Sequence, residues 1–170
     1  PEPPDQTDAR TVTEAVARAA SEHAEEVIPT QPEQLCEEAT ELVLNALANN
    51  QIIAVLRAGA HTSVRTEHPI AALATLDAEP GVRLINGFID RRHIHTDPET
   101  GTPIGGTIID FKTDKDADDE TLRERHSGQV NTYRRAVAAA YSLPLHAVDG
   151  VIVGLAPPAI DQLATPSRPA

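Results

Sequence analysis

Two aspartates and one lysine in the middle of the chain have the residue types and spacing for phosphodiester chemistry. Asp90 follows an apolar run, and Asp110 follows Ile108-Ile109 with Lys112 two positions later. Two neighbouring carboxylates bind a divalent cation such as Mg²⁺ or Mn²⁺, which polarises a phosphate and lowers the pKa of an attacking water. A lysine beside them can orient that water or offset the charge that builds on the phosphate. The three residues therefore predict a metal-dependent hydrolytic site.

A β-hairpin is the simplest element that would bring these residues together. Two β-branched runs, near residues 82–95 and 107–113, flank a turn-rich segment of Asp, Pro and Gly. Such a hairpin sets Asp90 beside Asp110, and the alternation of strand side chains puts Lys112 on the same face as Asp110. The alternative is that the aspartates only form turns at strand ends and that Lys112 protects an edge strand. Aspartate is depleted in strands, which favours the functional interpretation.

The remaining elements predict an α/β layer around a small mixed sheet. Apolar spacing indicates helices over 11–27 and 32–49, and the run at 52–56 fits either a helix or a strand. An alternating strand over 61–70 should end at Pro69. A solvated acidic loop over 114–120, a helix from 122 or 127 to 141, and a buried strand over 148–155 complete the pattern.

Three motifs resemble the RecB-type nuclease domains of the PD-(D/E)XK superfamily. They are Gly87-Phe88-Ile89-Asp90-Arg91, Ile108-Ile109-Asp110-Phe111-Lys112-Thr113, and Gln129 followed by Tyr133. The resemblance is specific over residues 67–141. It implies a restriction-endonuclease-like fold, with a small mixed central β-sheet flanked by helices. It also implies a Mg²⁺- or Mn²⁺-dependent deoxyribonuclease, an exonuclease rather than an endonuclease, at the C-terminal end of a helicase-nuclease that processes DNA double-strand breaks.

The resemblance assigns roles to further residues. Gln129 and Tyr133 share one helical face and would join Asp90, Asp110 and Lys112 in catalysis, although alone they are an ordinary amphipathic pair. Glu67 matches a glutamate that is either an outer-shell metal contact or a structural ion pair. His23 matches a metal-binding histidine of the first helix, but the family's preceding glycine is absent here, and a packed histidine is the alternative.

The charge distribution bears on DNA as the partner. The formal net charge is -12, yet residues 1–50 hold eleven acids against two arginines, whereas residues 83–135 hold ten acids against nine bases. The candidate site is thus close to neutral, and the rest of a larger protein would steer the nucleic acid. The acidic balance keeps a second hypothesis open, a catalytically inactive nuclease-like domain that binds DNA or a partner subunit. The expected phosphate contacts are Arg91, Arg92, Arg125, Arg134 and Arg135.

Several classes are disfavoured by what the sequence lacks. The lone Cys36 cannot form an internal disulfide, and it cannot supply the four ligands of an iron-sulfur cluster. No Gly-rich phosphate loop precedes a Lys-Ser or Lys-Thr pair, so no ATP site is expected within this segment. His93 and His95 alternate without a third ligand at zinc spacing. With no secretory signal and no long apolar run, the cytoplasm is the expected compartment, and no membrane contact is expected.

The Pro-rich ends suggest a segment of a longer polypeptide. We expect a linker over 1–10, one nuclease domain over 11–157 and a Pro-rich tail over 158–170. Helicase domains of the parent chain, and a second subunit, would then be partners besides DNA.

Overall fold

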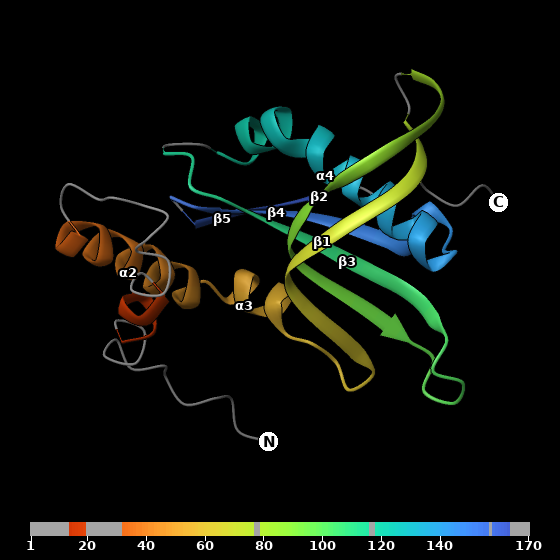
Figure 1. The fold of residues 1–170 in the computed structure, drawn as a ribbon. Coiled ribbons are helices and arrows are strands. Elements are labelled where there is room, and N and C mark those ends of the chain that lie inside the picture. The colour runs from red at the N-terminus through yellow and green to blue at the C-terminus, as the bar shows by residue number, and fades with distance from the viewer. Residues whose placement is uncertain (1–13, 20–31, 77–78, 116–117, 157, 164–170) are drawn as a thin grey trace. The chain divides into compact units, whose positions relative to one another are not determined.

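The computed structural model describes residues 14–19, 32–76, 79–115, 118–156 and 158–163. The chain divides into two compact units, Pro1–Ile53 and Ala54–Ala170 (Figure 1). In the first unit, residues 14–19 are helical, which agrees with part of the predicted first helix. The predicted metal ligand His23 lies outside the described residues.

Helix α2 (Pro32–Ala48) confirms the predicted second helix, and α3 (Asn50–Leu56) shows that the ambiguous run at 52–56 is helical. Asn49 separates the two helices because its side chain caps α3: Asn49 Oδ1 accepts hydrogen bonds from the amides of Gln51, at 2.9 Å, and Ile52, at 3.3 Å. Among the described residues, no single helix is long and apolar enough to cross a bilayer, and α2 and α3 pass that test only when they are joined as one bent pair.

The second unit is built on a mixed sheet in the order β1-β2-β3-β4-β5. Only β3 and β4 are parallel, and the chain between them forms the long helix α4. This arrangement confirms the predicted fold class. The strands are β1 (Thr62–Leu76), β2 (Glu79–Thr96), β3 (Pro103–Lys112), β4 (Val148–Leu155) and β5 (Pro158–Leu163), and α4 spans Asp119–Tyr141.

Helix α4 begins and ends at identifiable caps. Asp118 Oδ1 accepts a hydrogen bond of 2.9 Å from the Thr121 amide, and Ser142 adopts a left-handed conformation, at φ 54°, after the last turn. The apolar face of the helix buries Leu122, Val130 and Val137 in one cluster with residues of the sheet. α4 therefore fixes which face of the sheet is closed, and its polar residues near Gln129 reach the end of β3.

Two expectations about the strands are wrong. Pro69 does not end β1, because the strand continues to Leu76 and Pro69 pairs with Phe88 of β2. A proline is tolerated there since β1 is an edge strand of the sheet. The chain after residue 157 is not only a tail, because Pro158–Leu163 forms β5 along β4.

Candidate active site

Asp90 and Asp110 meet where β2 and β3 diverge. The last pair of the antiparallel ladder is Arg91 with Ile109, so Asp90 and Asp110 are the next positions in register. Beyond this point β2 pairs with β1 alone. Asp90 Oδ2 accepts a hydrogen bond of 2.8 Å from the backbone amide of Phe111. A carboxylate thus replaces the ladder bond that the separating strands no longer make, which fixes Asp90 beside Asp110.

Asp110 is a buried carboxylate whose Oδ2 oxygen is paired with the ammonium of Lys112. The residue is 2% exposed. Lys112 Nζ lies 2.7 Å from Asp110 Oδ2 and forms an ion pair with it. Burial raises the pKa of Asp110 and the negative charge of Asp90 adds to the shift, whereas Lys112 opposes it. The structure therefore keeps a carboxylate in a place where its charge is costly.

Lys112 connects this carboxylate to α4. Its ammonium donates a hydrogen bond of 3.1 Å to Gln129 Oε1, and its side chain is 17% exposed. Asp110 and Lys112 lie on the α4 side of β3, while Ile109, which precedes Asp110, is fully buried on the opposite face, as strand alternation predicts. The ammonium is held between two oxygen partners at the edge of solvent.

The second turn of α4 adds a charged pair next to this group. His126 Nε2 lies 3.0 Å from Asp114 Oδ2, and Arg125 Nη1 donates a hydrogen bond of 2.9 Å to Asp114 Oδ1. The pKa of Asp114 is lowered, first by Arg125 and then by His126. The side chain of His126 is only 19% exposed. The loop after β3 is thereby tied to the helix that carries Gln129.

Tyr133 and Glu67 occupy different places from Gln129. Tyr133 is half-buried and packs against β2, where a Cβ on Gly87 would lie 2.9 Å from its hydroxyl oxygen, so a larger residue at position 87 would displace the tyrosine. Glu67 is exposed and has a φ of 45°, a strained value for a glutamate. In the β1–β2 register its position faces Asp90, and neither of the two residues forms a ladder pair.

The arginines that were expected to contact phosphate fall into two groups. Arg92 and Arg134 are only 5% and 3% exposed. The Arg92 guanidinium lies 5.1 Å from the centre of the Tyr141 ring, and Arg134 Nε donates to the carbonyl of Val148 at 2.7 Å. Both are packed into the fold and have little surface left for a phosphate.

Arg91, Arg125 and Arg135 keep more of their surface. Arg91 is half-buried and donates to the carbonyl of Leu56 at 3.0 Å and to His93 Nε2 at 3.0 Å. Arg135 is also half-buried, whereas the side chain of Arg125 is 57% exposed. Arg125 is thus the most exposed of the three and lies next to the carboxylate site.

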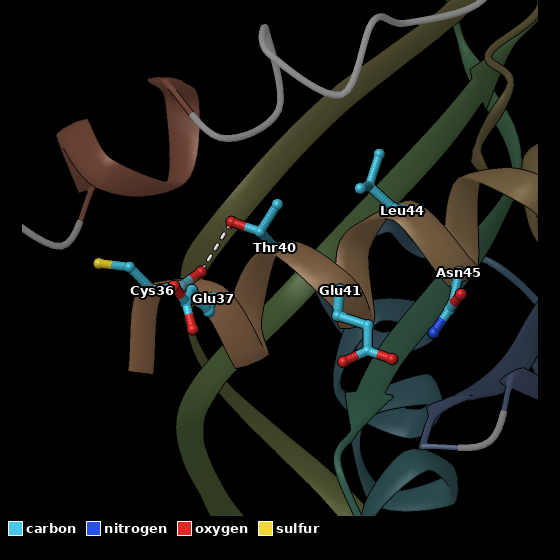
Figure 2. A pocket seen from close by; sticks show the side chains of 6 residues that line it. All are labelled: Cys36, Glu37, Thr40, Glu41, Leu44 and Asn45. Atoms are coloured by element: carbon cyan, nitrogen blue, oxygen red, sulfur yellow. Dashed lines mark hydrogen bonds between the residues drawn. The ribbon is translucent and has the colours of Figure 1, made fainter. Parts of the chain in front are cut away.

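A surface hollow of about 340 Å³ lies elsewhere, along α2, and Figure 2 shows the six side chains that line it. Thr40 Oγ1 donates a hydrogen bond of 2.7 Å to the carbonyl of Cys36, so the threonine hydroxyl is used within the helix. None of the predicted catalytic residues lines this hollow. The candidate metal-binding residues Asp90 and Asp110 thus do not belong to this hollow.

The donor set at the fork of β2 and β3 fits a hard divalent cation. Both residues offer carboxylate oxygens, and one ammonium, that of Lys112, is paired with Asp110. Within the described ranges, no group of three or more His, Cys, Asp or Glu side chains is arranged to hold a metal. Water and phosphate oxygens would have to complete the coordination, as is usual for Mg²⁺.

Comparison with known proteins assigns the class. The family model of the PD-(D/E)XK nuclease superfamily matches residues 1–167. The chain belongs to this superfamily, whose members are generally nucleases that use divalent metals such as Mg²⁺ and act on DNA. A search of curated proteins found no match.

Proposed function

We propose that this chain is a metal-dependent deoxyribonuclease whose site is formed by Asp90, Asp110 and Lys112. The observation that carries the proposal is the buried Asp110 carboxylate, which lies beside a second carboxylate and is paired with one ammonium, that of Lys112. Burying such a group costs free energy, and packing alone gives no reason to keep it. A divalent cation between the two carboxylates would offset their remaining negative charge.

Asp90 and Asp110 would hold Mg²⁺ or Mn²⁺. When bound, that ion would polarise the scissile phosphate and acidify water. Lys112 is placed to orient the attacking water through its ammonium and to balance the negative charge that builds on the phosphate. Gln129 holds the lysine at 3.1 Å and acts as a positioning residue. Glu67, opposite Asp90 in register, is proposed as an outer-shell contact.

Arg125 is the phosphate contact best supported by the structure. Its side chain is 57% exposed, and its partner Asp114 lies four residues after Asp110. A guanidinium bonds phosphate oxygens in the same geometry as carboxylate oxygens, so a DNA phosphate could replace Asp114 as its partner. We propose Arg91 and Arg135 as secondary contacts.

The motif resemblance supports a finer proposal, that the chain is the nuclease module of a helicase-nuclease in double-strand break repair. The acidic charge agrees with it, because a translocating motor would deliver DNA that a protein of net charge -12 repels at long range. Exonuclease action and a cytoplasmic location belong to the same proposal.

A catalytically inactive domain that binds DNA or a partner subunit is the second candidate. The specific observation in its favour is that the described residues supply two metal-binding carboxylates and no cluster of three. The proposed site would then serve only for recognition.

Digestion of DNA separates the two candidates. Linear and circular plasmid DNA would be incubated with the protein in Mg²⁺, Mn²⁺ or EDTA, beside Asp110→Ala and Lys112→Ala variants. We expect degradation that requires the metal, prefers linear DNA and is lost in both variants. DNA binding without any metal-dependent cleavage would favour the inactive domain, and degradation of circular DNA at the same rate would contradict the exonuclease proposal.

A further inference from the structure

The hairpin arm, defined as residues 68–76 and 79–89, exposes most of the large apolar side chains on the described surface. Here β1 and β2 pair only with one another within the sheet. The exposed fractions are 65% for Leu73, 64% for Val82, 68% for Leu84 and 62% for Phe88. Soluble monomers rarely expose a contiguous patch of this kind unless it binds something.

These four side chains share one face of the arm. Leu73 pairs with Leu84, and Val82, Leu84 and Phe88 occupy alternate positions of β2. The other face carries Ile70 and Ile85, which are buried in the core cluster that includes α4. The exposed residues therefore form an apolar stripe on the face of the arm that α4 does not cover.

The same face is hollowed next to the exposed leucines. A shallow hollow of about 470 Å³ is lined by residues 69–71 of β1 and 86–88 of β2. Ala71 pairs with Asn86, between the Leu73–Leu84 pair and the Pro69–Phe88 pair. Its short side chain leaves a depression between larger neighbours. A projection and a depression thus lie side by side on one surface.

The charge on this stripe also differs from that of the chain as a whole. Residues 69–73 and 84–88 contain no Asp, Glu, Lys or Arg, although the whole chain has a formal net charge of -12. Two copies of an acidic protein repel one another except where such an uncharged surface lets them approach. A nucleic acid would require cations that the stripe does not offer.

We propose that the apolar stripe is a self-association surface for a second copy of this chain. In a two-fold symmetric contact, one patch meets the same patch of its partner, so a projection must lie beside a depression that accepts it. The Leu73–Leu84 pair of each copy would enter the hollow between Pro69 and Phe88 of the other. The arms would pack face to face, and the stripes of both copies would be shielded from water.

Sedimentation of the full chain over a concentration series tests this proposal. From about 1 μM to about 1 mM, we expect a growing dimer fraction for the wild type and a monomer for Leu84→Lys. Ala71→Phe, which fills the hollow without adding charge, should raise the dimer dissociation constant at least tenfold. Ile104→Lys is the matched control, because Ile104 is 56% exposed but lies outside the arm, and it should dimerise like the wild type.

Thermal melting of each variant would establish that it is folded, which is expected because the substituted side chains are exposed. A wild type that stays monomeric throughout the series overturns the proposal. So does a Leu84→Lys variant that dimerises normally. If the protein is monomeric and Leu84→Lys instead changes its affinity for a single-stranded oligonucleotide, the stripe contacts DNA and the dimer assignment is wrong.

Discussion

Asp110 and Asp161 are two buried aspartates in one row of the sheet, and they differ in how their charge is satisfied. Asp110 pairs with Ile152, which pairs with Asp161, and both aspartates are 2% exposed. Arg123 Nε donates to both oxygens of Asp161, at 3.0 and 3.1 Å, and Arg123 Nη2 binds it as well. Asp110 is instead paired with the ammonium of Lys112, at 2.7 Å, and the negative charge of Asp90 lies close enough to raise its pKa.

The comparison teaches that burial alone does not mark a metal ligand. The Arg123 guanidinium forms hydrogen bonds to both carboxylate oxygens of Asp161. This ion pair links β5 to α4 and has a structural role. Asp110 has a second carboxylate nearby and a lysine that it shares with Gln129. We therefore assign a structural role to Asp161 and propose a metal-binding role for Asp110.

Cleavage activity should separate the two aspartates most strongly. Asp110→Asn should lower metal-dependent cleavage by at least about 10²-fold, because it weakens the proposed metal site and transition-state stabilisation. Asp161→Asn should retain most activity at temperatures where it is folded. Initial rates on linear DNA, with circular dichroism as the check of folding, measure both. Equal losses from two folded variants would break the distinction between the residues.

Stability should respond in the opposite sense. Asp161→Asn removes charge-assisted hydrogen bonds and should lower the free energy of unfolding by about 2 kcal/mol. Asp110→Asn removes a buried charge that desolvation disfavours, so in EDTA the free energy of unfolding should stay the same or rise. Urea denaturation of both variants tests this. A larger loss in Asp110→Asn than in Asp161→Asn would mean that Asp110 is mainly structural.

The raised pKa of Asp110 should contribute to the pH dependence of stability. Because burial raises this pKa, the folded state binds the proton more tightly than the unfolded state. The contribution of Asp110 to the stability of the metal-free protein should therefore be lost as pH rises from the ordinary aspartate pKa through the raised value. Asp110→Asn lacks this contribution, so the stability difference, wild type minus variant, should fall over that interval. A flat difference would show that the carboxylate titrates normally.

Gln129→Ala should have the smallest effect on activity. It removes one partner of Lys112, while the ion pair of Lys112 with Asp110 remains. A loss of about tenfold or less in kcat is expected, with little change in KM. Thr132→Ala is the control on the same helix, since its hydroxyl bonds the carbonyl of Gly128 within α4. A Gln129 variant that matches this control would remove Gln129 from the positioning role.

Local patterns predicted much of the site. Strand alternation and the turn around Asp97 placed Asp90 next to Asp110, because turn chemistry sets hairpin register. The turn forms as expected, with Asp97 Oδ1 accepting hydrogen bonds from the amides of Glu99 and Thr100. The helical spacing of Gln129 and Tyr133 was informative too, although only Gln129 contacts the lysine.

Contacts between distant segments could not be predicted in this way. The sequence of the run Pro158–Leu163 does not indicate that Asp161 binds Arg123, which lies 38 positions earlier in the chain. The burial of Arg92 and Arg134 depends on Tyr141 and on the carbonyl of Val148. Such pairings depend on how α4 packs on the sheet. Local sequence patterns carry no information about this packing. The contact between Asp114 and His126 could not be predicted either, because the sequence indicated only an acidic loop followed by a helix.

Metal-dependent thermal stability tests the central claim most directly. Melting curves in EDTA and in millimolar Mn²⁺ would compare the wild type with an Asp90→Asn, Asp110→Asn double variant and with Asp161→Asn. A ligand that binds only the folded state adds about 2.7 kcal/mol at a hundredfold excess over its Kd. We predict that Mn²⁺ raises the melting temperature of the wild type and of Asp161→Asn but not that of the double variant. An equal rise in all three proteins would contradict a metal site formed by Asp90 and Asp110.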